Sequence, residues 1–275
     1  MRRETAVRRG AVARELDGET VANGHWRLAG DAFLLRVEGG IGIHYRRGEG
    51  VSLEAPAQAD PRELALWLNG SVYAAVAALN GLLPLHASAV EHRGTVHAFA
   101  GPPGAGKSTL AAALGHEGFA LFCDDTLVLD LAGEGPAVCL PGHKRLKLWP
   151  EGIALAEARG GEAVAPEYPK HFAEPALAGD FTAPLPLAAI YFLETGETPA
   201  LRPLGPAERI ARLDDGHYTA RMFEAARDVS RPQRFAELAA IAARTTMARF
   251  FRPFDPTRFA ETRGFIADHI RSAAS

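Results

Sequence analysis

Residues 101–108 read Gly-Pro-Pro-Gly-Ala-Gly-Lys-Ser, which fits the phosphate-loop pattern G-x-x-x-x-G-K-[ST] at every fixed position. Such a loop binds phosphate because its backbone N–H groups and the N-terminus of the following helix point at the same anion. In this pattern Lys107 is expected to reach the β- and γ-phosphates, and the Ser108 hydroxyl is expected to bind Mg²⁺. The flanks agree, since residues 95–100 are apolar and residues 108–114 favour a helix.

A glycine-rich turn that happens to precede a helix is the alternative, but lysine usage favours a nucleotide site. Four of the 30 basic residues are lysines, and one of the four stands at the fixed lysine position of the pattern. A compact ammonium fits between two phosphates where a planar guanidinium does not. The predicted nucleotide-binding residues are Gly101, Pro102, Pro103, Gly104, Ala105, Gly106, Lys107, Ser108 and Thr109.

Two adjacent aspartates, Asp124 and Asp125, follow the short apolar segment 120–123. The helix and turn after the phosphate loop return the chain to the sheet, so we expect the pair at the sheet edge where open α/β folds bind ligands. Adjacent strand residues point to opposite faces, so one carboxylate is expected to serve Mg²⁺ and the other to accept a proton from an attacking hydroxyl. An exposed turn with two solvated acids is the alternative, which the phosphate loop disfavours.

A histidine and a basic segment are further candidates. His86 begins a strand-like segment ahead of the phosphate loop, but a lone histidine is more often structural than catalytic, so spacing alone assigns it no function. The three lysines outside the loop all lie within 144–170, which nominates that region as a second anion-facing surface. Its candidate contacts to the acceptor or phosphate are Lys144, Arg145 and Lys147. A solvated basic strand face is an equally good interpretation of these three.

The composition is typical of a globular protein. The chain has 275 residues, 47% of them hydrophobic, and a net charge of −3, which argues against general nucleic-acid binding. No segment has the apolar character of a signal peptide or a membrane span, so we expect a cytoplasmic protein that does not bind membranes. Cys123 and Cys139 lie on expected strands without metal-ligand spacing, which predicts small core residues in a reducing compartment.

The pattern along the chain predicts a small N-terminal β-rich subdomain, residues 1–82, before an α/β domain at 83–275. Segments 32–37 and 41–45 flank Gly39-Gly40, which is typical of a tight hairpin. A helix is then expected from Pro61, capped by Asp60 and ended near Gly81.

From residue 83 onward, strands and helices alternate, which predicts an α/β core with helices packed on a sheet. Strands are expected at 85–90, 95–100, 120–123, 127–129 and 187–193, and helices at 107–115, 207–213, 234–244 and 257–270. Residues 151–186 are rich in Ala, Glu, Gly and Pro and show little periodicity. We therefore expect an irregular connection there and a candidate lid over the nucleotide.

The motifs taken together resemble the HPr serine kinase/phosphorylase family, and most closely an HPr-kinase-like group within it. The segments that carry the resemblance are His86-Ala-Ser-Ala-Val90, the phosphate loop, Gly118-Phe-Ala-Leu-Phe-Cys-Asp-Asp125, Leu66-Trp-Leu-Asn-Gly70 and Arg145-Leu-Lys-Leu-Trp-Pro150. The resemblance is dense over 83–150 and thinner over 20–82 and 186–273. It implies the phosphate-loop fold of the HPr kinase C-terminal domain, which is shared with phosphoenolpyruvate carboxykinase.

The resemblance also implies roles and a reaction. Asp124 matches the general base for phosphoryl transfer, His86 matches an active-site histidine, and Asp125 is then expected to support the metal together with Ser108. The implied activity is an ATP- and Mg²⁺-dependent kinase that phosphorylates a serine hydroxyl of a protein or peptide, such as a ribosomally made lasso-type precursor. A small-molecule kinase and a nucleotide-binding regulatory protein without transfer activity are the alternatives, and a homo-oligomer is left open.

Overall fold

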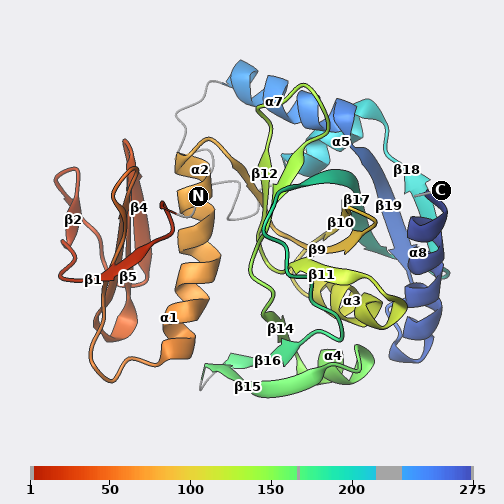
Figure 1. Cartoon of the computed structure of the whole chain (residues 1–275), viewed down its shortest axis with the longest axis horizontal. Coiled ribbons are helices and arrows are strands. Elements are labelled where there is room, and N and C mark those ends of the chain that lie inside the picture. Colours follow the sequence, from red (N-terminus) through yellow and green to blue (C-terminus); the bar gives the residue numbers. More distant parts are fainter. Residues whose placement is uncertain (1–2, 166–167, 215–230, 274–275) are drawn as a thin grey trace. The chain divides into compact units, whose positions relative to one another are not determined.

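The computed structural model describes residues 3–165, 168–214 and 231–273, and these form two compact units (Figure 1). The first unit extends to Pro84, near the boundary expected at residue 82, and the second begins at Leu85. The fold is a mixed α/β fold with several sheets. In the described part of the chain, no helix combines the length and the apolar character needed to cross a membrane.

The first unit is built on a five-stranded sheet with the strand order β1-β7-β6-β5-β4. The predicted hairpin is confirmed, because β5 and β6 pair antiparallel and the short turn η1 (Glu38–Gly40) joins them. Gly39 and Gly40 have φ of 74° and 83°, a conformation that glycine adopts without strain. The strands of this unit are β1 (Val7–Arg9), β2 (Glu15–Leu16), β3 (Glu19–Thr20), β4 (His25–Ala29), β5 (Ala32–Val37), β6 (Ile41–Arg46) and β7 (Gly50–Glu54).

The predicted helix of the first unit is also confirmed. The Asp60 carboxylate accepts a hydrogen bond from the Arg62 backbone N–H at 2.8 Å, which caps α1 (Pro61–Trp67). The chain then widens into a π-helical turn, η2 (Leu68–Val72), where polar residues interrupt the apolar pattern, and continues as α2 (Tyr73–Leu79). One apolar face of the sheet packs against these helices through Phe33, Leu35, Ile43, Leu64 and Val76.

The second unit contains a larger sheet whose central strands run in the order β11-β9-β10-β17-β19-β18. β10 is parallel to β17, and β17 is parallel to β19. β9 is antiparallel to both β10 and β11, so β11 has the same direction as β10. β8 (Leu83–Leu85) spans the boundary between the two units. The strands of this sheet within the second unit are β9 (Ala87–His92), β10 (Thr95–Ala100), β11 (Ala120–Cys123), β12 (Leu127–Asp130), β13 (Val138–Leu140), β17 (Leu185–Thr195), β18 (Ala200–Pro203) and β19 (Thr246–Arg252).

The four helices that the sequence predicts in the second unit are confirmed. They are α3 (Lys107–Leu114), followed by η3 (Gly115–Glu117), then α5 (Pro206–Leu213), α7 (Arg231–Arg244) and, after η4 (Pro256–Arg258), α8 (Phe259–Ala273). The core between α3, α8 and the sheet contains Phe99, Leu110, Phe250 and Ile266. Cys123 and Cys139 are free and buried, and burial raises the pKa of both thiols.

The prediction of an irregular connection over 151–186 was wrong. A helix, α4 (Pro150–Leu155), leads into a three-stranded sheet of order β14-β16-β15, whose strands are β14 (Leu146–Leu148), β15 (Arg159–Ala165) and β16 (Tyr168–Glu174). Residues 166 and 167 lie outside the described residues. The sequence shows no strand pattern in β15 because most of its side chains are exposed, and backbone pairing to β16 holds it in place.

Candidate active site

One edge of the larger sheet collects the residues that the sequence nominates. The carboxyl ends of parallel strands meet at the same edge, so the ends of β10, β11, β17 and β19 lie together. The phosphate loop follows β10, and the two aspartates follow β11. His86 lies at the same edge because it precedes β9, which runs in the opposite direction.

The phosphate loop is a tight turn that ends in α3. Gly104 and Gly106 have φ of 82° and 80°, where a side chain would strain the backbone, and Gly106 is the N-cap of α3. The Lys107 ammonium donates hydrogen bonds to the carbonyl oxygens of Gly101 at 2.8 Å and Pro102 at 3.2 Å. A phosphate oxygen is a stronger acceptor than a carbonyl oxygen, so a bound phosphate would compete for the same ammonium.

Lys107 is a buried cation. Burial lowers the pKa of its ammonium, and the nearby carboxylates of Asp124 and Asp125 act in the opposite direction. The positive charge of Lys170 on β16 lowers the same pKa further. The structure therefore brings together three groups that are far apart in the sequence: the loop lysine, the aspartate pair and a lysine of the 144–170 region.

Asp124 is buried and joined to the phosphate loop through a serine. Its Oδ1 accepts a hydrogen bond from the Ser88 hydroxyl at 2.6 Å, and the hydroxyl oxygens of Ser88 and Ser108 lie 3.4 Å apart. Ser88 is itself buried on β9. Among the described residues, no basic side chain forms an ion pair with Asp124, which distinguishes it from its neighbour Asp125.

Asp125 lies between a lysine and a histidine. Its Oδ2 is 2.7 Å from the Lys147 ammonium, and its Oδ1 is 3.4 Å from Nδ1 of His86. Burial alone would raise the pKa of the Asp125 carboxyl, but the charges of Lys147, His86 and His143 hold it below its usual range. Asp125 has a φ of 70°, which is uncommon for a residue with a side chain. Its carboxylate contacts Lys147, whereas that of Asp124 contacts Ser88.

His86 occupies a break between strands. The sequence predicts one strand over 85–90, but β8 ends at Leu85 and β9 begins at Ala87, so His86 stands between them. Its Nδ1 is 3.0 Å from the carbonyl oxygen of Asp125, in addition to the contact with the carboxylate. The histidine therefore touches the second aspartate of the pair and helps to hold its unusual backbone conformation.

Of the three basic candidates in 144–147, the structure brings Lys147 to the aspartates. Lys144 lies 5.5 Å from the centre of the Phe181 ring. The Arg145 guanidinium lies 3.7 Å from the centre of the Phe172 ring. These two cations lie over aromatic rings in cation–π contacts, while Lys147 forms an ion pair with Asp125.

Two further polar residues were not singled out in the sequence. Ser88 lies in the segment His86–Val90, and the structure shows that its hydroxyl donates a hydrogen bond to Asp124. His143 accepts a hydrogen bond on Nδ1 from the Arg145 N–H, and burial lowers the pKa of its ring, so the neutral ring carries its proton on Nε2. The carbonyl of His143 accepts from the Asp124 N–H at 3.2 Å, so this loop also positions the aspartate pair.

The oxygen atoms at this edge suit Mg²⁺, a hard cation that prefers hydroxyl, carboxylate, phosphate and water oxygens. Ser108 and the two aspartates provide a hydroxyl and two carboxylates. In the ranges that the structure describes, no three His, Cys, Asp or Glu side chains cluster as a metal site. Mg²⁺ usually keeps several waters and takes only one or two protein carboxylates, and the hydroxyl and carboxylates at this edge fit that kind of site.

Comparison with known proteins leaves the family of this chain open. No family model matches it, and no curated protein matches it. Among solved structures, the Hpr(Ser) kinase/phosphatase from Coxiella burnetii is similar over 70% of this chain and 90% of its own, at 14% sequence identity and a TM-score of 0.38. A TM-score of this size does not establish a shared fold, so the functional argument depends on the residues of the site.

Proposed function

We propose that the chain is an ATP- and Mg²⁺-dependent kinase that transfers the γ-phosphoryl group to a serine hydroxyl of a protein or peptide. The observation that carries the proposal is the convergence, at one sheet edge, of the Lys107 phosphate loop with Asp124 and Asp125. Phosphoryl transfer requires these parts: donors that hold the phosphates, a cation that neutralises charge, and a carboxylate that accepts the proton of the attacking hydroxyl.

The nucleotide is held by the loop. The Lys107 ammonium and the backbone N–H groups of the non-proline residues in 101–108 would bind the phosphates, and Ser108 and Asp125 would hold Mg²⁺. Bound Mg²⁺ would neutralise the negative charge that develops on the phosphates during transfer. Asp125 suits this role because its lowered pKa keeps it ionised.

The proton of the acceptor goes to Asp124. Among the described residues no basic side chain forms an ion pair with Asp124, so its carboxylate is the one left to accept the proton of the attacking hydroxyl. The seryl oxygen forms a bond to the γ-phosphorus as the bond from that phosphorus to the β,γ-bridging oxygen breaks, and ADP leaves. His86 and Lys147 position Asp125 through their contacts with its carboxylate.

Mass spectrometry of peptides incubated with the protein, ATP and Mg²⁺ tests the proposal. We expect one added phosphoryl group on a seryl peptide, and none on the same peptide with alanine at that position. Small hydroxylated metabolites are assayed in parallel. Phosphate on a metabolite instead would make the chain a small-molecule kinase, and ATP binding without transfer to either class would make it a regulatory protein.

Two variants separate binding from transfer. Asp124→Asn is expected to lower the transfer rate about 1,000-fold with little change in ATP affinity, because it removes the base and leaves the loop intact. Lys107→Ala is expected to weaken ATP binding itself. Transfer by Asp124→Asn at the wild-type rate would refute the base assignment, and unchanged ATP affinity in Lys107→Ala would refute the phosphate-loop interpretation.

A further inference from the structure

A buried arginine lies against the phosphate loop on the side away from the aspartates. Arg252 ends β19 and is 8% exposed, and its Nη2 donates a hydrogen bond to the carbonyl oxygen of Ala105 in the loop. Among the residues that the structure describes, none provides a hydrogen-bond partner for its buried Nε. Across the described ranges, no carboxylate forms an ion pair with Arg252, and the nearby Glu194 instead pairs with Arg212 and Arg249.

A buried guanidinium without a counter-charge is unfavourable, which points to an anionic ligand. Burial also lowers the pKa of Arg252, although the group stays charged at any physiological pH. Gly106 leaves room for the guanidinium, since a Cβ at that position would lie 3.2 Å from Nη2, a close contact. Arg252 therefore lies beside the N-cap of α3, where the loop N–H groups favour the binding of an anion.

A pocket of about 470 Å³ opens next to this arginine. Loop residues Pro102 and Gly104 form one side, the end of β17 contributes Leu193 and Thr195, and Arg252 and Phe254 form another side. Phe254 is 69% exposed, and the Arg252 guanidinium lies 5.6 Å from the centre of its ring. Glu194 and Arg212 also line the pocket, and they pair with each other. The pocket thus combines apolar surface, an aromatic ring and the Arg252 cation, which are groups that recognise a nucleoside phosphate.

The order of the strands gives the bound nucleotide a direction. β11, which positions Asp124, and β17 with β19, which position the pocket, lie on opposite sides of β10 and its phosphate loop. A triphosphate bound along the loop has its reacting end toward Asp124. Its other end then points toward the pocket.

We propose that this pocket holds the nucleoside end of the bound nucleotide, with Phe254 stacked on the base and Arg252 paired with the phosphate nearest the ribose. The proposal rests on the nucleotide binding proposed above and adds a location and two residues to it. It assigns Arg252 a binding role that the sequence alone does not indicate, because Arg252 lies far along the chain from Lys107.

Titration calorimetry with ATP and with inorganic tripolyphosphate tests the proposal, because tripolyphosphate retains the phosphate chain without the nucleoside. We expect wild-type protein to bind ATP more tightly than tripolyphosphate. Phe254→Ala is expected to weaken ATP binding about tenfold and to leave tripolyphosphate binding unchanged, since one stacked base is lost. Phe235→Ala on α7 is the matched control, because Phe235 is also exposed, at 58%, and does not line the pocket.

The outcomes separate this proposal from the proposed function. Equal affinity of the wild-type protein for ATP and tripolyphosphate, or unchanged ATP affinity in Phe254→Ala, would overturn the pocket assignment and leave the phosphate loop standing. Failure of the wild-type protein to bind either compound would overturn both. Arg252→Gln is expected to weaken the binding of ATP and of tripolyphosphate alike. If Arg252→Gln does not fold, Phe254→Ala still tests the proposal.

Discussion

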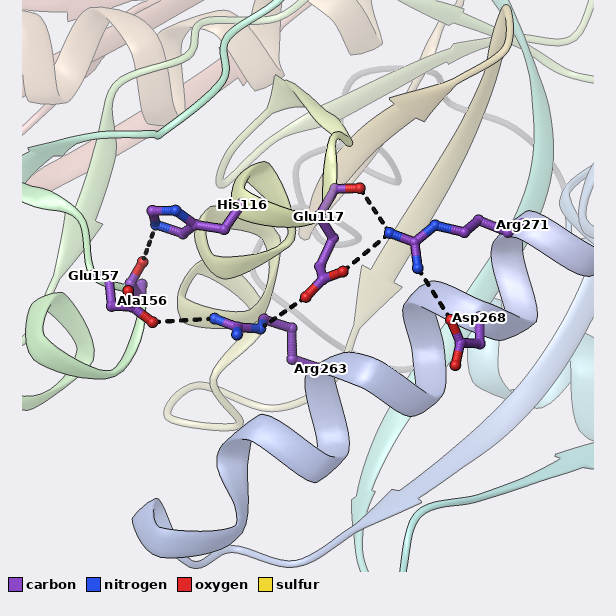
Figure 2. Close-up of polar contacts among 7 residues, drawn as sticks. All are labelled: His116, Glu117, Ala156, Glu157, Arg263, Asp268 and Arg271. Carbon is purple, nitrogen blue, oxygen red and sulfur yellow. Dashed lines mark hydrogen bonds and ion pairs between the residues drawn. The ribbon is translucent and has the colours of Figure 1, made fainter.

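Each end of α3 lies near a cluster in which one carboxylate contacts two basic side chains. We call the cluster near the N-terminal end the inner cluster and the one near the C-terminal end the outer cluster. At the N-terminal end, Asp125 contacts Lys147 and His86 beside the phosphate loop. At the C-terminal end, Glu117 contacts Arg263 at 3.3 Å and Arg271 at 3.0 Å, which ties α8 to the turn after α3 (Figure 2). Each cluster joins segments that are distant in the sequence.

The cluster at Glu117 is the more exposed of the two. The side chains of Lys147 and Asp125 are 13% and 19% exposed, whereas those of Arg263, Glu117 and Arg271 are 21%, 26% and 41% exposed. Arg263 also reaches Glu157, and Arg271 reaches Asp268, so the charges of the outer cluster are shared among several exposed partners (Figure 2). Water screens such pairs, so their contribution is to hold α8 in place.

The helix dipole gives the clusters opposite tasks as well. The N-terminus of α3 presents unpaired N–H groups and attracts anions, which suits a phosphate. Its C-terminus presents carbonyl groups, and Arg271 donates a hydrogen bond to the backbone carbonyl of Glu117 at 2.9 Å. A carboxylate between two basic side chains is therefore proposed to serve binding at one end of the helix, and at the other end it ties α8 to the turn after α3.

The largest expected contrast between the clusters comes from removing one cation from each. Lys147→Met is expected to lower the transfer rate about 100-fold, because Asp125 loses the partner that holds it ionised and in place. Arg263→Met, the matched control, is expected to change that rate by less than about twofold. The measurement is kcat for peptide phosphorylation at saturating ATP and Mg²⁺. Equal losses in both variants would erase the functional distinction between the two ends of α3.

The ion pair of Asp125 is also expected to make the stability of the folded protein depend on pH. The folded-state pKa of Asp125 lies below its unfolded value, so its contribution is fully present above about pH 4 and is lost as pH falls through the folded pKa. Asp125→Asn lacks this titration. The difference in Tm between wild type and Asp125→Asn should therefore be largest near neutral pH and should shrink at pH 3. A difference independent of pH would contradict the ion pair.

The smallest effect is expected at the outer cluster. Glu117→Gln removes the carboxylate that two arginines share and is expected to lower the free energy of unfolding by about 1 kcal/mol. The loss should diminish in concentrated salt, because exposed pairs are screened. Denaturant unfolding at low and high salt measures it. A loss that salt does not change would show that Glu117 acts through packing.

Local sequence determined a large part of the architecture. The glycine turn before α3, the Asp60 cap and the hairpin at Gly39-Gly40 were all predicted, because each depends on the backbone preferences of a few consecutive residues. The pairing of β15 with β16 was not predicted, because exposed side chains leave no periodic pattern and partner strands alone hold such a segment.

The tertiary structure decided which polar side chains meet. Three neighbouring basic residues had equal standing in the sequence, and the path of β14 brings Lys147 to Asp125. Ser88 reaches Asp124 across 36 residues, and Arg252 reaches Ala105 across 147. The physical reason is that a motif of consecutive residues specifies its own backbone, whereas these contacts depend on which strands of the sheet become neighbours and in which direction they run.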